Sequence, residues 1–270
     1  MNQERFWQLK MFDLTLKKKQ RLTALHHILG SLDPKTRCLL VTCGDNNGAM
    51  NYHLRQIGGI WSWAEMESTS IPEMEGLLGE PVQQVSPDRL SYADDTFDIV
   101  VSIDCLEHIE NPFHFVTELN RICRPQRRVI ITVPGGERIK FVNFLKHIVG
   151  MTRESYGHVV DGYSVDQLQG MMKDAGIIQC NARTFSRFFT EIIELGINLA
   201  YVKYLSRKSQ VAVKEGTIAP ATSDQLKSVE KTYRLYARVY PLFRAISSLD
   251  RLLFFTRGYV TVVEGIKDGR

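Results

Sequence analysis

The chain has 270 residues, of which 44% are hydrophobic and 24% are charged. These proportions are those of an ordinary globular protein, so they exclude a disordered, low-complexity or collagen-like chain. Lys and Arg number 34 against 30 Asp and Glu, and the net charge of +4 is too small to indicate a nucleic-acid-binding protein.

Five cysteines are scattered through the sequence, and none of them forms a Cys-x-x-Cys pair. This pattern predicts neither a zinc site nor a disulfide framework, so we expect no metal site and a reducing, cytoplasmic environment. Residues 1–20 carry charges throughout and lack the apolar core of a signal peptide. No uncharged apolar run reaches the length of about 18 residues that a membrane span needs.

Apolar residues at helical spacing predict one helix through the first thirty residues, ending near Gly30 and Pro34. Its KKKQR segment, residues 17–21, is expected to face solvent. A buried strand over 38–42, a helix over 49–57 and a strand over 60–64 follow. This alternation with short links predicts a parallel sheet with right-handed crossovers.

The clearest strand is FDIVVSI, residues 97–103, which is almost wholly apolar, as a strand covered on both faces should be. Asn111 and Pro112 have the pattern of an N-cap and a first helical residue, and a strand over 129–133 follows that helix. Ser164 and Gln167 form a capping box for another helix, which leads into a strand over 177–184.

Residues 186–257 break this alternation and precede a last strand over 259–266. They contain two apolar-aromatic helical stretches, 188–205 and 233–255, and carry twelve basic residues against six acidic ones. Basic amphipathic helices with aromatic faces suit an anionic membrane surface or an acceptor with a lipid tail. The other interpretation is a helical lid that packs its aromatic face on the sheet and leaves its basic face in water.

Polar residues follow three of the predicted strands. Thr42 to Gly48 form a turn of small and polar residues, Glu65 and Glu67 follow the second strand, and Asp104 to His108 follow FDIVVSI. Ligands of open α/β sheets bind outside the carboxyl ends of the strands, so these three segments predict a site. An acid after the second strand can accept hydrogen bonds from both ribose hydroxyls of a nucleoside. The GDNNG turn excludes the G-x-G-x-x-G fingerprint of dinucleotide binding.

The run LSYADDTFDIVVSIDCLEHIENPFHFVTELNRICRPQRRVIITVP closely resembles the central stretch of class I S-adenosylmethionine-dependent methyltransferases, in the type 11 branch typified by quinone-biosynthesis enzymes. HVVDGYSVDQLQGMMKDAGI is also similar to that branch, and the resemblance spans about residues 36–184. It implies a Rossmann-like, seven-stranded, mostly parallel sheet with helices on both faces and an antiparallel last strand. With the helical insertion before that strand, the chain divides into an N-terminal helical cap (1–35), a cofactor domain (36–185 and 258–268) and the insertion (186–257).

The same resemblance implies S-adenosylmethionine as the cofactor and assigns residues to it. The cofactor loop falls on Thr42, Gly44 and Asn46, the ribose-binding acid on Glu65 with Glu67 as second candidate, the adenine-side residue on Ser86 or else Asp88, and the methionine end on Asp104 with the Leu106–Glu107–His108 triplet. The loop departs from the family pattern, because Leu40, Thr42 and Asn46 replace an acid and two of three glycines. Asn tolerates left-handed backbone angles, so the last replacement is mild.

Methyl transfer mainly requires alignment of donor and acceptor, but an oxygen or activated carbon acceptor also needs a base. Histidine suits that task near neutral pH, and His108 and His158 are the candidates, the second with Asp161 and Tyr163 nearby. The alternative for each is a hydrogen-bonded structural histidine. The histidines on predicted helices are interpreted as surface or packing residues: His26, His27, His114 and His147.

The sequence therefore favours an S-adenosylmethionine-dependent methyltransferase that acts on a small-molecule or lipid-linked acceptor. The acceptor would enter through a cap made by the N-terminal helix and the insertion. Two alternatives remain open: a non-catalytic methyltransferase-fold partner protein, suggested by the altered loop, and a peripheral membrane-binding module, suggested by the insertion.

Overall fold

The computed structural model describes residues 6–44, 47–137, 140–149, 158–200 and 230–269. Its sheet has seven strands in the order β3-β2-β1-β4-β5-β7-β6. The strands are β1 (Arg37–Thr42), β2 (Ile60–Glu65), β3 (Val82–Gln84), β4 (Phe97–Ile103), β5 (Cys123–Pro134), β6 (Ile177–Phe185) and β7 (Val260–Lys267). Strands β1 to β5 run parallel to one another, whereas β7 runs antiparallel to both β5 and β6. The predicted Rossmann-like sheet with an antiparallel last strand is confirmed.

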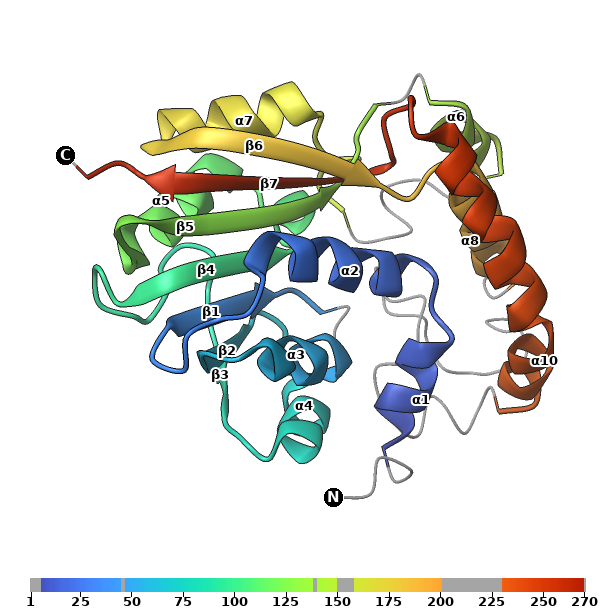
Figure 1. Ribbon diagram of the computed structural model, residues 1–270, viewed down its shortest axis with the longest axis horizontal. Helices are drawn as coiled ribbons and strands as arrows, with labels where there is room; N and C mark the ends of the chain where they lie inside the picture. The colour runs from blue at the N-terminus through green and yellow to red at the C-terminus, as the bar shows by residue number, and fades with distance from the viewer. Residues whose placement is uncertain (1–5, 45–46, 138–139, 150–157, 201–229, 270) are drawn as a thin grey trace.

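Helices cover both faces of the sheet (Figure 1). One face packs against α1 (Trp7–Asp13), α2 (Lys17–Leu29), α3 (Ala49–Leu54) and α4 (Ile71–Leu78), and the other against α5 (Pro112–Ile122) and α7 (Val165–Asp174). Successive residues of β4 alternate between the two buried clusters, with Val100 in one and Val101 in the other. This explains why the strand is apolar at nearly every position.

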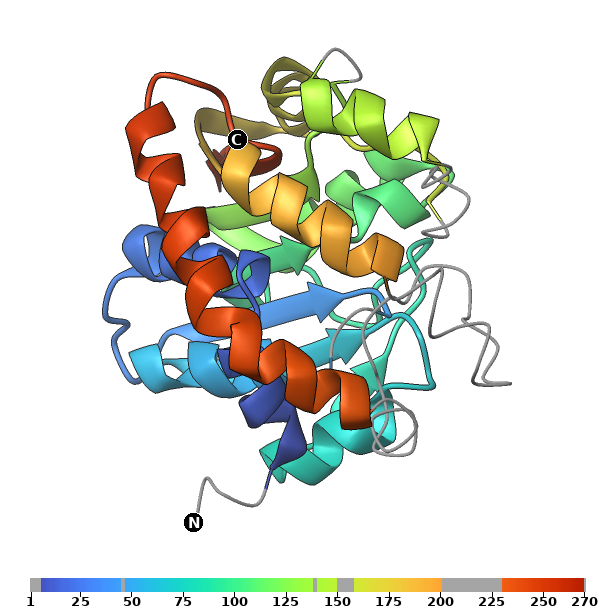
Figure 2. The same ribbon diagram turned by 90° about the vertical axis from the view of Figure 1, so that its right-hand side faces the viewer.

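The other helices lie beyond the carboxyl ends of the parallel strands (Figures 1 and 2). They are α6 (Phe141–Ile148), α8 (Phe188–Ala200), α10 (Glu230–Ser247) and the short 3-10 helix η6 (Ser248–Leu253). Because α8 follows β6 and η6 precedes β7, the predicted helical insertion before the last strand is confirmed. The polar linker between its two helical stretches lies outside the described residues.

The N-terminal segment forms two helices, so the prediction of a single helix is wrong. The Thr15 hydroxyl donates to the Phe12 carbonyl at 2.8 Å, and the chain turns between α1 and α2. The hydroxyls of Tyr236 and Tyr240 on α10 donate to the carbonyls of Leu14 at 2.5 Å and Thr15 at 3.2 Å. Tertiary contacts thus satisfy the backbone groups that the break exposes, and they join α10 to the N-terminal helices.

The expectation that residues 17–21 face solvent is also wrong for two of them. The Lys17 ammonium lies 2.8 Å from the carboxylate of Glu191, a fully buried residue of α8 that also pairs with Lys146 of α6 at 3.0 Å. Arg21 is only 6% exposed and forms an ion pair with Asp104 at the end of β4. Charged groups of α2 therefore bind both the insertion and the sheet.

The two predicted helix caps are confirmed. The Asn111 side chain accepts a hydrogen bond from the His114 backbone N–H at 3.1 Å. Ser164 and Gln167 exchange the two hydrogen bonds of a capping box at the start of α7. Both helices thus begin where their side chains satisfy unpaired backbone donors.

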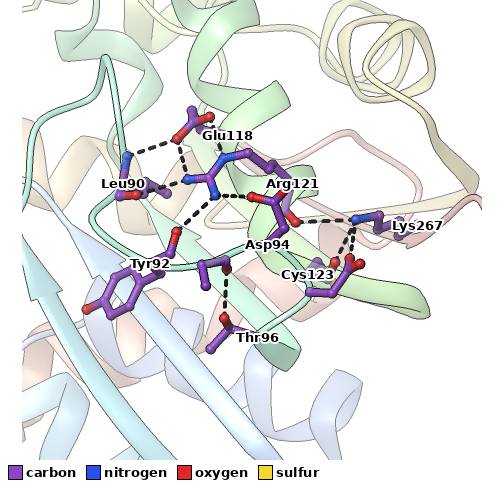
Figure 3. Close-up of polar contacts among 10 residues, drawn as sticks. Leu90, Tyr92, Asp94, Thr96, Glu118, Arg121, Cys123 and Lys267 are labelled. Carbon is purple, nitrogen blue, oxygen red and sulfur yellow. Dashed lines mark hydrogen bonds and ion pairs between the residues drawn. The ribbon is translucent and has the colours of Figure 1, made fainter.

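Arg121, near the end of α5, holds the loop between β3 and β4 (Figure 3). Its guanidinium donates to the carboxylates of Glu118 and Asp94 and to the carbonyls of Leu90 and Tyr92. Lys267, at the end of β7, donates to Asp95 Oδ1 and to the carbonyls of Arg121 and Cys123. The loop that carries Ser86 is therefore anchored to α5 at several points.

Candidate functional site

The strand order reverses at β1, whose neighbours are β2 on one side and β4 on the other. Turns that follow β1 and β4 diverge at such a point and leave a crevice. A pocket lies there, bounded by Thr42 and Cys43 at the end of β1 and by Ile103 and Asp104 at the end of β4. Its other walls are Asn47, Ala49 and Met50 around the start of α3, and Phe12, Lys18 and Arg21 of the N-terminal helices. Of the predicted cofactor residues, Thr42 and Asp104 line this pocket.

Glu65 organises the turn after β1. One carboxylate oxygen accepts from the Thr42 hydroxyl at 2.7 Å, and the other accepts from the backbone N–H groups of Gly44 at 2.7 Å and Glu67 at 2.9 Å. Burial raises the pKa of Glu65, although these three donors oppose that shift. The carboxylate is fully buried beneath the loop, so its oxygens bind the protein rather than facing the pocket.

Glu67 is half-buried and lies against the cofactor loop. Gly44 has a φ of +70°, and a Cβ atom added there would lie 2.7 Å from Cδ of Glu67. Glycine is therefore required at this position for two reasons, the left-handed backbone and the close approach of the carboxyl group. Of the two candidate ribose-binding acids, Glu67 is the one with solvent access beside the loop.

Asp104 has a left-handed backbone, with a φ of +48°, directly after β4. Its N–H donates to the Thr132 carbonyl at 3.0 Å, and Oδ1 accepts from the Thr132 hydroxyl at 3.3 Å. Oδ2 pairs with the Arg21 guanidinium. Strained backbone of this kind is held in place by such surrounding bonds and is found at functional sites. The pocket thus carries the anionic Asp104 and the cationic Arg21 side by side, and Lys18 adds a second cation to its wall.

Sequence reasoning missed Arg21, because it treated the KKKQR segment as a solvated charge run. A signal was present: Arg21, Leu25 and Leu29 recur at a spacing of four residues, which places Arg21 on the apolar side of the segment. Phe12 and Lys18 also line the pocket without having been proposed for it.

His108 and His158 come from distant parts of the chain and lie together. Their ring centroids are 4.7 Å apart and the rings are perpendicular. His108 ends the 3-10 helix η3 (Leu106–His108), and the segment after His158 docks on that helix. There the Val159 N–H donates to the Glu107 carbonyl at 2.7 Å, and the Tyr163 hydroxyl donates to the Leu106 carbonyl at 3.3 Å.

Glu107 joins the two histidines in one cluster at the end of β4. The side chain of Glu107 is buried, and one ligand atom from each of the three residues lies within 4.8 Å of the others. Two imidazoles and a carboxylate in this arrangement could move a proton or hold a divalent cation. Burial raises the pKa of the neighbouring Tyr163 to about 12, so its hydroxyl stays protonated.

The remaining predicted residues lie outside the pocket or outside the described residues. Ser86 follows β3, is exposed, and accepts a hydrogen bond from the Asp88 N–H at 3.3 Å. Asn46 lies outside the described residues. His27, His114 and His147 are exposed on helices, and burial lowers the pKa of His26. These four histidines lie on helices, as predicted.

Residues 3–177, more than half of the chain, match the family model of a methyltransferase domain. The chain belongs to this methyltransferase domain family. The fold and the class I resemblance agree with that membership, and S-adenosylmethionine is the family's cofactor.

Solved structures of low sequence identity share the fold of this methyltransferase domain. Phosphoethanolamine N-methyltransferase 2 of Haemonchus contortus, solved with phosphomonomethylethanolamine and S-adenosylhomocysteine, gives a TM-score of 0.57 at 14% identity, over 92% of this chain and 52% of that one. The chain thus spans about half the length of the Haemonchus enzyme. An S-adenosylmethionine-dependent methyltransferase of Thermotoga maritima gives 0.54 at 16% identity, over 98% and 94% of the two chains.

A third structure, from Haloferax volcanii, is a complex between the Trm112 methyltransferase activator and a methyltransferase. It gives a TM-score of 0.55 at 14% identity, over 94% of each chain. At such identities the likeness shows a shared fold, and the residues of this chain must carry any argument about its chemistry.

The residues at the crevice fit S-adenosylmethionine. Because Gly44 has no side chain, the carboxyl group of Glu67 lies against the loop, where it can accept hydrogen bonds from ribose hydroxyls. Arg21 and Asp104 supply a cation and an anion, which complement the carboxylate and the ammonium group of a methionine moiety. The pocket lies at the switch point between β1 and β4, where α/β sheets bind nucleotides.

Proposed function

We propose that the protein transfers the methyl group of S-adenosylmethionine to a small-molecule or lipid-linked acceptor. The observation that carries this proposal is the cluster of Glu107, His108 and His158 at the end of β4, next to a crevice whose residues suit the cofactor. Membership of the methyltransferase domain family supports it.

In this proposal the cofactor is held by four contributions. Thr42, Gly44 and Asn46 form the loop, and Glu67 accepts from the ribose hydroxyls while Glu65 braces the loop from beneath. Ser86 lies on the adenine side. Asp104 and Arg21 contact the charged groups of the methionine end, and these contacts replace part of the ion pair between the two residues.

When bound, S-adenosylmethionine supplies a methyl group on a positively charged sulfur, which leaves as a neutral thioether. His108 accepts the proton from an oxygen or activated carbon acceptor, and His158 and Glu107 hold the imidazole in position. A nitrogen acceptor with a free lone pair would need only alignment and the exclusion of water.

The acceptor is proposed to enter through a cap formed by residues 1–35 and 186–257. Contacts between α10 and the turn after α1, and between Lys17 and Glu191, support such a unit. Peripheral contact of residues 186–257 with an anionic membrane belongs to the same proposal, because a lipid-linked acceptor resides there.

Calorimetric titration with S-adenosylmethionine tests the proposal. We expect saturable binding, and we expect Gly44→Ala to weaken it at least about 10-fold, because the added methyl displaces the Glu67 carboxyl group from the loop. Gly79→Ala is the matched control: Gly79 has a φ of +66° and nothing within 4 Å of an added Cβ, so cofactor binding should be unchanged. No detectable binding to the wild-type protein at millimolar cofactor would contradict the proposal.

Glu67→Gln tests which acid binds the ribose. Losing a charged acceptor for the ribose hydroxyls should weaken cofactor binding by about 10-fold or more, with no change in thermal unfolding. Asp174→Asn removes an exposed acid at the end of α7 and should bind the cofactor normally. Normal cofactor affinity in Glu67→Gln would return the ribose role to Glu65.

A non-catalytic partner protein is the second candidate, favoured by the loop that keeps one glycine of the usual three. That candidate predicts binding of a protein partner without methyl transfer to any acceptor. Incubation with methyl-labelled S-adenosylmethionine and panels of phenols, carboxylic acids, amines and membrane lipids separates the two, because label in any acceptor excludes the non-catalytic protein.

A further inference from the structure

The apolar residues of helix α6 extend beyond the side that packs against its own fold. Val142 is buried and Leu145 packs beside it, in a cluster with Leu195 of α8. Phe141, Phe144 and Ile148 recur at spacings of three and four residues, so they share one side of the helix. All three are exposed. A helix whose exposed apolar residues continue its packed side is expected to contact something beyond its own fold.

A second group of exposed apolar side chains follows α10. Leu252, at the end of η6, and Phe254 and Phe255 just after it project from this segment, and the two phenyl rings lie 5.7 Å apart in an edge-to-face arrangement. Together with Phe141, Phe144 and Ile148, these side chains are between 56% and 78% exposed. We call these six residues the docking face.

The two parts of the docking face occur at the same end of the molecule, beyond the carboxyl ends of the strands (Figures 1 and 2). They are joined where Lys140, just before α6, donates to the Gly258 carbonyl at 2.5 Å and lies over the Tyr259 ring. The exposed residues therefore form two groups on the same end of the molecule rather than scattered single side chains, which would need no explanation.

The segment that carries Leu252, Phe254 and Phe255 is fixed at both ends. The buried Asp250 carboxylate accepts from the backbone N–H groups of Arg187 and Phe189, each at 2.8 Å, at the start of α8. The Arg187 side chain donates to the Thr256 carbonyl at 3.2 Å, and the Thr256 N–H donates to the Leu253 carbonyl at 2.9 Å. The apolar side chains are thus held outward by a bonded backbone, which lowers the entropic cost of binding.

The charges beside Phe254 and Phe255 are positive. Arg251 and Arg257 are exposed on either side of the two phenylalanines, and the acid in the same stretch, Asp250, is buried. Aromatic and aliphatic side chains flanked by arginines match the interface of an anionic bilayer, where rings enter the acyl boundary and arginines meet phosphates. Two copies of this chain would instead place like charges opposite each other, which disfavours self-association.

We propose that the docking face seats this protein on the surface of an anionic lipid bilayer, with Phe254 and Phe255 inserted and Arg251 and Arg257 on the headgroups. The contact is peripheral, since no helix in the part of the chain that the structure describes is long and apolar enough to cross a bilayer. This inference rests on the proposed function for its purpose, because it brings the cap next to a lipid-linked acceptor.

Co-sedimentation with vesicles tests the docking face. The full chain should bind phosphatidylcholine vesicles that contain phosphatidylglycerol, more weakly as salt is added, and bind pure phosphatidylcholine poorly. Phe254→Ser with Phe255→Ser should lower partitioning about 100-fold, and Arg251→Gln with Arg257→Gln about 30-fold. Ile60→Ser is the matched control, since Ile60 is 58% exposed at the opposite ends of the strands and should not affect binding.

Three results would overturn the docking face: no binding to anionic vesicles, equal binding to neutral ones, or unchanged binding of the phenylalanine variant. Sedimentation without vesicles adds a fourth, because a dimer abolished by Phe254→Ser with Phe255→Ser would assign the face to a second copy. Calorimetry on the same preparations keeps the two proposals apart. Loss of cofactor binding with vesicle binding intact contradicts methyl transfer from the cofactor and leaves the docking face standing. The reverse contradicts the docking face and the membrane contact of residues 186–257 and leaves methyl transfer from the cofactor standing.

Discussion

Glu191→Ala is expected to lower the free energy of unfolding by about 3–5 kcal/mol, because it leaves two lysines in a buried site without their shared anion. Glu191 accepts from the Ser186 hydroxyl at 2.6 Å and pairs with Lys17 of α2 and Lys146 of α6. One residue of α8 thus joins three helices of different chain regions. Urea unfolding at neutral pH, followed by tryptophan fluorescence, measures the effect.

The pH dependence provides a second reading of the same cluster. Burial alone would raise the pKa of Glu191, but the charges of Lys17 and Lys146 outweigh it and hold that pKa at about 2, below the ordinary value of 4.5. Because its pKa is depressed, the Glu191 carboxylate contributes to the free energy of unfolding in full above pH 4.5. That contribution is lost as the pH falls toward 2. The difference in the free energy of unfolding between wild type and Glu191→Ala should therefore shrink as the pH falls from 4.5 toward 2.

Asp95→Asn is the control, because it removes the charge of an exposed carboxylate that pairs with Lys267 at 2.7 Å on the surface. A surface ion pair contributes about 0–1 kcal/mol, so the loss should be several times smaller than for Glu191→Ala. Equal losses in the two variants, or a Glu191 effect that does not change with pH, would contradict the role of the buried cluster.

Most strands of the sheet could be predicted, because their own residues carry the pattern that identifies them. The apolar run of β4 and the caps at Asn111 and Ser164 need no distant partner to be recognised. Strand β3 carries no such signal, since it has three residues and two of them are exposed glutamines. Its pairing with β2 makes it a strand.

The break between α1 and α2 and the burial of Arg21 escaped prediction for a different reason. Neither glycine nor proline marks the break, and the tyrosines that satisfy its carbonyls come from the far end of the chain, on α10. A charge run in sequence indicates solvent, but Arg21 is buried because Asp104 lies opposite it in the fold. Such pairs depend on topology that local patterns do not contain.

The sequence named individual candidate residues for the site but not their arrangement. The resemblance placed an acid, a glycine loop and His108 near the strand ends, and the need for a base added His158 from a later loop. The structure brings the two histidines into contact. It could not show that the Glu65 carboxylate is engaged by Thr42 and Gly44, because that depends on side-chain direction rather than residue type. The position of Glu67 against Gly44 escaped prediction for the same reason.

His108→Ala is expected to lower kcat for an oxygen or activated carbon acceptor about 10²–10⁴-fold, the usual contribution of a positioned base. Cofactor binding by calorimetry should stay normal, since the effect falls on proton transfer. Methyl transfer is measured with methyl-labelled cofactor and the acceptor found in the panels above. His27→Ala, which removes an exposed histidine of α2, is the control and should keep full activity.

The pH profile distinguishes a base from a merely structural histidine. If His108 accepts the proton, its replacement removes the fall in rate on the acid side, whereas loss of structure lowers the rate evenly at all pH values. Glu107→Gln should lower kcat less than His108→Ala, because it alters the orientation of the imidazole without removing it. Activity that is lost with a chelator and restored by a divalent cation would instead assign Glu107, His108 and His158 to a metal ion. Equal activity of His108→Ala and wild type would show that His108 is not the base.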